Sequence, residues 1–523
     1  MGESKTIGTY KGTLRPLNGK GVAGVRADKT ISPAKDRVTT TGKTFSKAAG
    51  NVTESSTFSK PAETIARPPE TEVSFAQPPS RPVVEPVISA THFTPISNDT
   101  WLARNGHNLT FAGIFLFTLV LYFRPYELIP ALSGFQSIAL IIAVATLLVF
   151  LPTQFTLEGN FTALPIEVKC ALFVTAWALL TIPLAKNPGL AWATFNDTFI
   201  KVVLMFIVMV NTLRTKKRIT ALMWLGIGVG LMLSWQAVDL YQRGEFKTDG
   251  YRVSVDFGGM FGNPNDMSIH LVIFIPIAVA LGAAAKSWLM KAVFFASAAI
   301  MTAGSFVTQS RGAFLGMIAV AAVLVWKFGR RQRFKTTLIA CVAGIITILL
   351  APGNYGLRVL SIFIPSLDPV GSSDQRTELL MRSIVVTLRN PLGIGIGNFE
   401  IVGTHNLGTH NAFTQVSSEL GWLAFAAYMI FLLSPIRKLD LMERQLFAKD
   451  DNSWLYYLSI GVQASIAGYF VSSFFSSVAY NWYVYYPVAF AIGLRRIYQL
   501  ENESGMSEHP NAVIRTDLEA QPA

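Results

Sequence analysis

Long apolar runs, separated by short polar segments, recur along the chain from about residue 107 to residue 497. Each run has close to the ~20 residues that an α-helix needs to cross a bilayer. The pattern predicts an all-α integral membrane protein with about twelve transmembrane helices. The expected spans are 107–123, 134–152, 170–185, 197–213, 219–239, 267–285, 289–308, 312–327, 336–351, 420–435, 455–475 and 481–496.

The two ends of the chain lack this pattern. Residues 1–106 are basic and rich in Pro, Ser and Thr, a composition that cannot bury a core, so we expect a disordered tail. The tail shows no apolar run typical of a cleavable signal peptide. We therefore divide the chain into this tail, a membrane domain over residues 107–497 and a short carboxyl-terminal tail over 498–523.

Composition and charge support a membrane protein with a defined orientation. The chain is 51% hydrophobic and 15% charged, which excludes an ordinary soluble domain. The basic segments "RTKKR" (214–218), "KFGRRQRFK" (327–335), "RK" (437–438) and "RR" (495–496) fall on one side once the spans alternate. The positive-inside rule makes this side cytoplasmic, and both termini with it. Insertion and contact with anionic membrane lipids explain the net charge of +12, so no nucleic-acid partner is expected.

The opposite side receives the longest connection, residues 352–419, and a long loop in a protein of short loops is usually functional. Its segment "SSDQRTELLMRSIVVTLRNP" places Leu380, Ile384 and Leu388 at helical spacing. We expect an amphipathic helix lying on the outer membrane surface. Arg376 falls in its first turn, where the helix dipole also favours an anion. The alternative for Arg376 is a solvated surface charge.

Two motifs follow this helix. In "PLGIGIGNF" the glycine spacing does not complete a dinucleotide fingerprint and instead predicts a tight turn with close backbone packing. In "GTHNLGTHNAFTQVSSELGW" two histidines lie five residues apart. At helical spacing His410, Thr414, Ser417 and Gly421 share one face as the chain enters the next membrane helix, which puts His410 at its outer mouth.

The sequence resembles the shared carboxyl-terminal region of bacterial O-antigen ligases, O-antigen polymerases and related exopolysaccharide polymerases. The resemblance rests on an S-x-x-x-R pattern followed by "NPLGIGIGNF" and "HNAFTQVSSELGW". Two upstream blocks, "GYRVSVDFGGMFGNPND" (250–266) and "TQSRGAFLG" (308–316), occur in the order expected for this family. Together these motifs extend the resemblance over roughly residues 110–497.

The resemblance implies a glycosyltransferase of cell-surface polysaccharide biosynthesis. Such an enzyme moves a glycan from a polyprenyl-diphosphate donor to a hydroxyl acceptor, on the periplasmic face of the bacterial inner membrane and without a cofactor. By matching position, His410 is the implied catalytic residue, and Arg252, Arg311 and Arg376 are the implied diphosphate-binding residues. His405 has no family counterpart, and we expect it to be a loop residue.

The required chemistry agrees with these residues. Breaking a glycosyl phosphate bond leaves charge on the diphosphate, which a divalent metal or fixed cations can stabilise. The outer loops contain no D-x-D pair and no His/Asp cluster at ligand spacing, so arginines are the available electrophiles and we expect no metal. Histidine titrates in the range that suits a base, and the alternative for His410 is a hydrogen-bonded structural role.

Other functions remain open at this stage. The main alternative is a small-solute transporter. The helices of such proteins usually carry ionisable residues near the middle of the membrane, whereas these spans contain few, namely Lys201, Lys291 and His270. A structural anchor for the tail would leave the outer arginines and histidine unexplained. A ligase, a polymerase and a protein O-glycosylation ligase share a donor site. The segment "YFRPYELIPAL" (122–132), which resembles the first outer loop of ligase-like proteins, favours a ligase.

Overall fold

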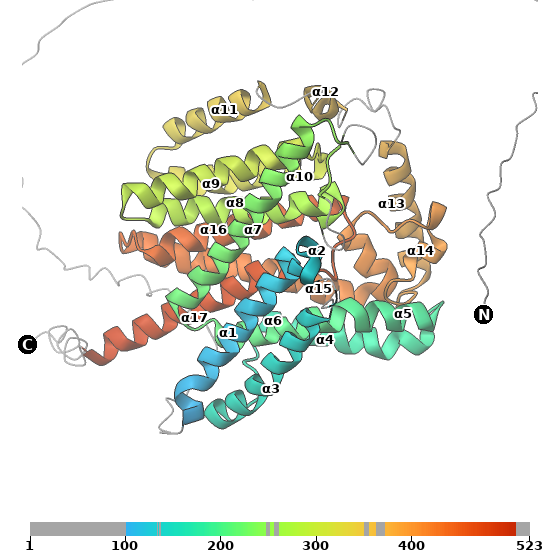
Figure 1. Ribbon diagram of the computed structural model, residues 1–523, viewed down its shortest axis with the longest axis horizontal. Helices are drawn as coiled ribbons and strands as arrows, with labels where there is room; N and C mark the ends of the chain where they lie inside the picture. Colours follow the sequence, from blue (N-terminus) through green and yellow to red (C-terminus); the bar gives the residue numbers. More distant parts are fainter. Residues whose placement is uncertain are drawn as a thin grey trace, which may run out of the picture. The chain divides into compact units, whose positions relative to one another are not determined.

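The computed structural model describes residues 101–132, 134, 137–246, 252–255, 261–349, 355–361 and 372–508. All secondary-structure elements in these residues are helices, which confirms the predicted all-α fold (Figure 1). Most of the two predicted tails, residues 1–100 and 509–523, lies outside the described residues. The first helix, α1 (Trp101–Phe123), begins before the start predicted for the membrane domain.

Ten helical segments in the described part of the chain are long and apolar enough to cross a membrane. Their positions agree with ten of the predicted spans. They are α1; α3 (Ile138–Glu158); α4 (Ile166–Thr181) with η2 (Ile182–Leu184); α5 (Pro188–Thr194) with η3 (Phe195–Phe199) and α6 (Ile200–Thr212); α7 (Lys216–Gln242); α8 (Pro264–Ala284); α9 (Trp288–Val307); α10 (Arg311–Phe328); α15 (Ala412–Ala448); and α16 (Trp454–Ser472) with η8 (Ser473–Phe475).

The two remaining predicted spans coincide with α11 (Arg333–Leu349) and α17 (Tyr485–Glu508). α11 has only 17 residues, and α17 carries Arg495 and Arg496 followed by a polar second half. The described residues of neither helix reach the length and hydropathy of a span. Both segments are helical as predicted, but the count of about twelve spans is not confirmed.

Shorter helices lie between the spans, and one of them confirms the helix predicted in the long connection. In α13 (Ser372–Arg389), Leu379 and Ser383 are buried, whereas Ile384 and Leu388 are exposed. The buried side packs on α15, so α13 presents an apolar face away from the protein. The shorter helices are α2 (Pro125–Leu128), η1 (Pro130–Leu132), η5 (Gly329–Arg331), α12 (Tyr355–Leu360), α13 (Ser372–Arg389), α14 (Phe399–Val402) and η7 (Thr404–Asn406).

Helix α16 packs between α8 and α10 near the centre of the bundle (Figure 1). Small residues make this close approach possible, as is usual between membrane helices. A Cβ on Gly461 would lie 2.5 Å from the Cβ of Ala280, and one on Gly468 would lie 2.6 Å from Val320 Cγ2. Larger side chains at these two glycines would force the helices apart.

One end of the bundle, which we call the basic end, is held together by buried ion pairs. The basic segments predicted to share one side of the membrane meet there around three glutamates. Lys327 and Arg330 bind Glu443 at 2.8 and 2.6 Å. Arg496 binds Glu158 at 3.1 Å, with Arg214 as a second partner, and Glu167 receives Arg495 at 3.1 Å and Lys438 at 3.3 Å.

Candidate functional site

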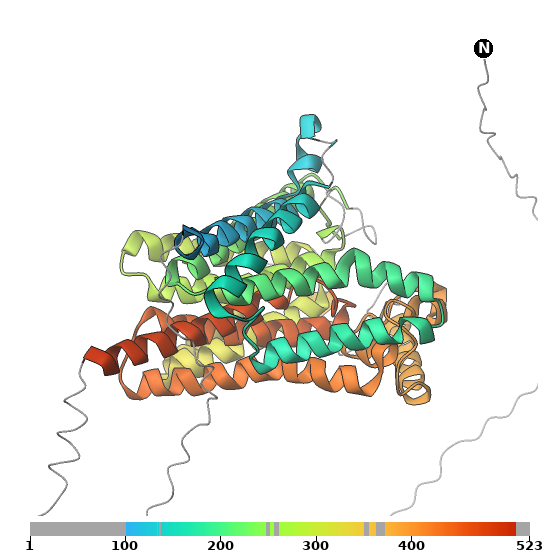
Figure 2. The ribbon, with the colours of Figure 1, turned by 90° about the horizontal axis from the view of Figure 1, so that it is seen from below.

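The opposite end of the bundle, which we call the loop end, gathers the residues singled out in the sequence. Arg311 begins α10, whereas Lys327 lies near the other end of the same helix at the basic end. α15 likewise begins at the loop end and carries Glu443 near its far end. Helices α13 and α14 lie beside the first turns of α15 (Figures 1 and 2).

Arg252 ties two of the family-like blocks together. Its Nε donates to the carbonyl oxygen of Thr308 at 3.1 Å, and its guanidinium donates to Asn265 Oδ1 at 2.7 Å. Asn265 Oδ1 also accepts from the Ser310 hydroxyl at 2.9 Å. The side chain of Arg252 is 4% exposed. The arginine of the first block is therefore fixed against the corner that precedes Arg311.

Arg311 is held at the first turn of α10. The preceding residue, Ser310, caps this helix by accepting from the N–H of Ala313 at 3.3 Å. Arg311 as a whole is 7% exposed, and its guanidinium donates to Ser361 Oγ at 3.1 Å. Guanidinium presents five donors in a rigid fork, so this bond helps to fix the orientation of the group.

His410 lies directly before the amino-terminal cap of α15. The cap is Asn411, whose side chain accepts from the N–H groups of Phe413 at 2.9 Å and Thr414 at 3.0 Å. His410 itself adopts a left-handed backbone conformation with φ of 49°. Its N–H donates to Ser477 Oγ at 2.8 Å. This conformation is uncommon for a residue other than glycine, so His410 is held in place by its surroundings.

The structure brings His410 and Arg376 close together. Burial of the half-buried imidazole lowers the pKa of His410, and the positive charge of Arg376 lowers this pKa further. Arg376 is in the first turn of α13, as predicted. A depressed pKa leaves His410 neutral at pH 7, which is the protonation state that a general base requires.

A segment that sequence reasoning missed links the separate blocks. Ser476 and Ser477 follow η8 in the stretch "SSFFSSVAYN". Ser476 Oγ donates to the carboxylate of Asp266 at 2.6 Å, while Ser477 Oγ accepts from His410 and lies 3.1 Å from Thr409 Oγ1. The signal in the sequence was a pair of serines between two apolar runs, which alone does not show which loops they contact.

The glycine motif fills a break in α15. Gly421 has φ of 77° and ψ of −174°, so the helix is interrupted at this residue. A Cβ on Gly421 would lie 2.1 Å from the Pro391 carbonyl oxygen, and a Cβ on Gly393 would lie 2.2 Å from the Glu419 carbonyl oxygen. These contacts confirm the predicted tight turn. The bonds across the break are Trp422 N–H to Pro391 O (3.1 Å), Ile394 N–H to Ser418 O (3.1 Å) and Gly395 N–H to Glu419 O (2.9 Å).

The carboxylate of Glu419 binds backbone N–H groups of the same glycine turn. It is buried and accepts from the N–H of Gly397 at 2.8 Å and from the N–H of Phe399 at 3.3 Å. Gly397 has φ of 71°, and a Cβ there would lie 2.2 Å from Thr194 Oγ1. These bonds give Glu419 a structural role in holding the loop that leads to His410.

The predicted shared face of His410, Thr414, Ser417 and Gly421 is wrong. α15 begins at Ala412, after His410, and Gly421 is not helical. The Asn411 cap starts the helix later than the spacing suggested, and the glycine loop interrupts it. His410 still lies at the mouth of α15. His405 belongs to the turn η7, as expected of a loop residue, and its side chain lies outside the described residues.

Metal ligands do not cluster within the described residues, where no three His, Cys, Asp or Glu side chains could hold one ion. Residues 247–251 and 256–260, which flank Arg252 and include Asp256, lie outside the described part of the chain. The predicted metal independence therefore stays a prediction. The described residues place an imidazole and three guanidinium groups at the loop end, groups that can exchange a proton and bind an anion, respectively.

A comparison with protein families agrees with this chemistry. Residues 296–429 match the family model described as O-antigen ligase. This segment of the chain is similar to the O-antigen ligase family. The matched residues of this O-antigen ligase-like protein run from within α9 into α15 and include Arg311, Arg376 and His410. Arg252 and Ser477 lie outside the match. A search of curated proteins finds no match.

Proposed function

We propose that this O-antigen ligase-like protein is a metal-independent glycosyltransferase that moves a glycan from a polyprenyl-diphosphate donor to a hydroxyl acceptor. The observation that carries the proposal is the half-buried His410 beside Arg376, in the segment that matches the family. Arg252 and Arg311 lie at the same end of the bundle and are fixed by hydrogen bonds to neutral oxygens.

The reaction assigns a role to each group. The acceptor oxygen attacks the anomeric carbon, and the bond from that carbon to the diphosphate oxygen breaks. Polyprenyl diphosphate departs with the electron pair, and the three arginines stabilise its charge. His410 accepts the proton of the acceptor hydroxyl, a role that its lowered pKa supports because the imidazole is then neutral near pH 7.

We propose further that the loop end faces the periplasm and that both termini are cytoplasmic in the bacterial inner membrane. Support comes from the ion-paired lysines and arginines at the other end, since basic segments are retained in the cytoplasm. A reporter active only outside the cytoplasm should be active when fused after Gly371 and silent when fused after Arg331. The reverse pattern would place the site in the cytoplasm.

The acceptor distinguishes a ligase from a polymerase. Both use the same donor chemistry, but a ligase transfers to a lipid or protein hydroxyl and a polymerase to a second copy of the glycan. We place the ligase first on the segment at 122–132. Purified protein offered one lipid-diphosphate donor with either a separate hydroxyl acceptor or none decides between them, because only a polymerase extends the donor-linked glycan alone.

The two histidines provide the test of the mechanism. His410→Ala should lower turnover by a factor on the order of 10²–10⁴, because a general base is lost. His405→Ala is the matched control and should stay near wild type. The assay uses purified variants of equal thermal stability with a lipid-diphosphate donor. Wild-type turnover of the His410 variant would remove the catalytic assignment and leave a structural histidine.

A further inference from the structure

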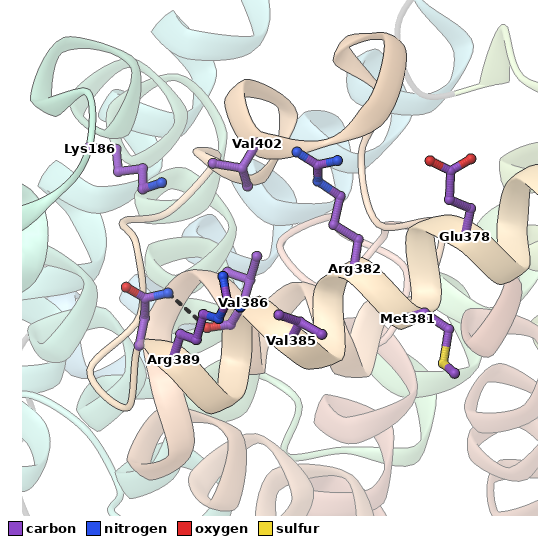
Figure 3. A pocket seen from close by; sticks show the side chains of 9 residues that line it. Lys186, Glu378, Met381, Arg382, Val385, Val386, Arg389 and Val402 are labelled. Carbon is purple, nitrogen blue, oxygen red and sulfur yellow. Dashed lines mark hydrogen bonds between the residues drawn. The ribbon is translucent and has the colours of Figure 1, made fainter.

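A cationic groove at the loop end is separate from the His410 site. It has a volume of about 550 Å³ and lies between α13, α14 and the loop after η2 (Figure 3). Its lining shares no residue with the three candidate diphosphate-binding arginines or with His410. The lining residues are Lys186, Glu378, Met381, Arg382, Val385, Val386, Arg389, Asn390 and Val402.

The groove carries excess positive charge. Lys186, Arg382 and Arg389 line it, against one carboxylate, Glu378. All four side chains are exposed, and within the described ranges no ion pair joins any of them to another residue. Figure 3 shows that Lys186 reaches the groove from the loop and the two arginines from α13. The charge of this groove suits a phosphodiester, and its volume leaves room for more of the ligand than that group alone.

The groove faces away from the reaction site. Arg376 and Arg382 are six residues apart on α13, which places them about 120° apart around the helix axis. Between them lies the buried face of α13 with Leu379 and Ser383. The cation close to His410 and the cations of the groove therefore project from opposite flanks of one helix.

Apolar surface continues from the cationic side of α13. Met381, Val385 and Leu388 are 62%, 43% and 65% exposed, and Leu392 just beyond the helix is 50% exposed. A soluble anion would make no favourable contact with these apolar side chains. An amphiphile would place its phosphate among the cations and its acyl chains along the apolar side chains.

The position along the spans points to the membrane headgroup region. Lys186 follows the end of the span Ile166–Leu184 by two residues. Arg389 ends α13 close to Pro391, whose carbonyl accepts from the N–H of Trp422, where the long part of α15 begins. Trp422 is 46% exposed, and exposed tryptophans are common at the level of the headgroups.

We propose that this groove binds the phosphodiester of an anionic phospholipid from the surrounding bilayer, with the acyl chains lying along Met381, Val385 and Leu388. The lipid would anchor α13 on the membrane surface from the flank opposite Arg376. The proposal concerns binding alone and does not depend on glycan transfer.

The test uses the full chain purified in detergent, with phosphatidylglycerol, phosphatidylcholine of the same acyl chains, or inorganic phosphate as probes. Native mass spectrometry counts bound lipid, and the thermal midpoint reports stabilisation of the folded protein. We expect phosphatidylglycerol to bind and to raise the midpoint, and the other two probes to have little effect. The double variant Arg382→Gln/Arg389→Gln should bind phosphatidylglycerol about 30-fold more weakly, roughly fivefold for each cation.

Matched variants distinguish a specific loss of lipid binding from a folding defect. Arg243→Gln removes an exposed cation outside the groove and should bind like wild type. Lys186→Gln repeats the charge test from the opposite wall, and Leu388→Ser weakens the apolar contact without a charge change. Equal affinity of the double variant and wild type would overturn the proposal, and so would equal binding of the two lipids. If inorganic phosphate raised the thermal midpoint and phosphatidylglycerol did not, the proposal of a lipid ligand would be overturned, and the groove would be a site for a simple anion.

Discussion

The two ends of the bundle use basic residues in different ways. At the basic end, Lys327 and Arg330 bond to the buried carboxylate of Glu443, and Arg496 bonds to the largely buried Glu158. At the loop end, the hydrogen bonds described for Arg252 and Arg311 go to a carbonyl, an amide and a hydroxyl oxygen. The same residue types are therefore seen bonded to carboxylates between helices at one end and to neutral oxygens at the other.

The difference has a physical cause. A buried guanidinium paired with a carboxylate forms a neutral unit, which fixes packing and attracts no further anion. The bonds described for the loop-end arginines go to neutral oxygens, which fix the orientation of a guanidinium through its rigid fork of donors. Substitutions at the basic end should therefore change stability, and substitutions at the loop end should change turnover.

The largest expected effect is on stability at the basic end. Glu443→Gln leaves Lys327 and Arg330 without the carboxylate that now binds both, at a fully buried position. We expect a loss of unfolding free energy of about 3–5 kcal/mol, nearer the lower figure because Lys327 keeps Asp440. Unfolding in denaturing detergent measures it. Arg444→Gln, which breaks an exposed pair with Asp440, is the control and should change little. Reduced turnover per folded molecule would contradict the separation of the two ends.

At the loop end, Arg376→Gln should act on catalysis. Loss of one preorganised cation at a developing charge lowers turnover by a factor on the order of 10²–10³. Because Arg376 is only half-buried, the unfolding transition should stay close to that of wild type. Purified protein with a lipid-diphosphate donor gives both measurements. Unchanged turnover would assign Arg376 to the solvated surface.

The pH dependence of activity tests whether Arg376 acts on His410 at the loop end. Burial and the charge of Arg376 lower the pKa of His410 from its ordinary value of 6.5. A base must be deprotonated, so activity should rise with pH through this lowered pKa and be nearly complete at pH 7. Arg376→Gln removes a positive charge, which favours the imidazolium and raises the pKa. The acidic limb of kcat/KM should therefore move to higher pH in that variant, and an unmoved limb would separate the two residues.

A smaller effect is expected for the serine that holds His410. Ser477→Ala removes the acceptor of the His410 N–H, and turnover should fall about tenfold, as expected for one lost hydrogen bond. Ser477→Thr keeps the hydroxyl and should restore most of the activity. Ser453, whose hydroxyl caps α16 at the basic end, provides the control, since Ser453→Ala should leave turnover unchanged. Equal loss in both alanine variants would point to a general defect of packing.

Much of the site was predictable from local pattern. Hydrophobic runs located the ten helical segments long enough to cross a membrane, although α15 and the segment from Pro188 to Thr212 extend well beyond their predicted bounds. The motif blocks singled out Arg311, Arg376 and His410. The amphipathic helix at α13 followed from the spacing of Leu380, Ile384 and Leu388. Such features depend on the period of a helix and on residues near each other in sequence, so they can be predicted from residue spacing alone.

The start of α15, its break at Gly421 and the clustering of distant blocks were decided by the tertiary structure. The break is stable because the carbonyl and N–H groups around it bond to a loop 24 to 31 residues earlier, which no local pattern shows. Ser476 and Ser477 contact Asp266 and His410 across 210 and 67 residues of sequence. Local sequence patterns specify which segments are helical and which residues carry reactive groups. Only the packing of the helices decided which of those groups meet, because hydrogen bonds between distant segments form where the folded chain brings donors and acceptors together.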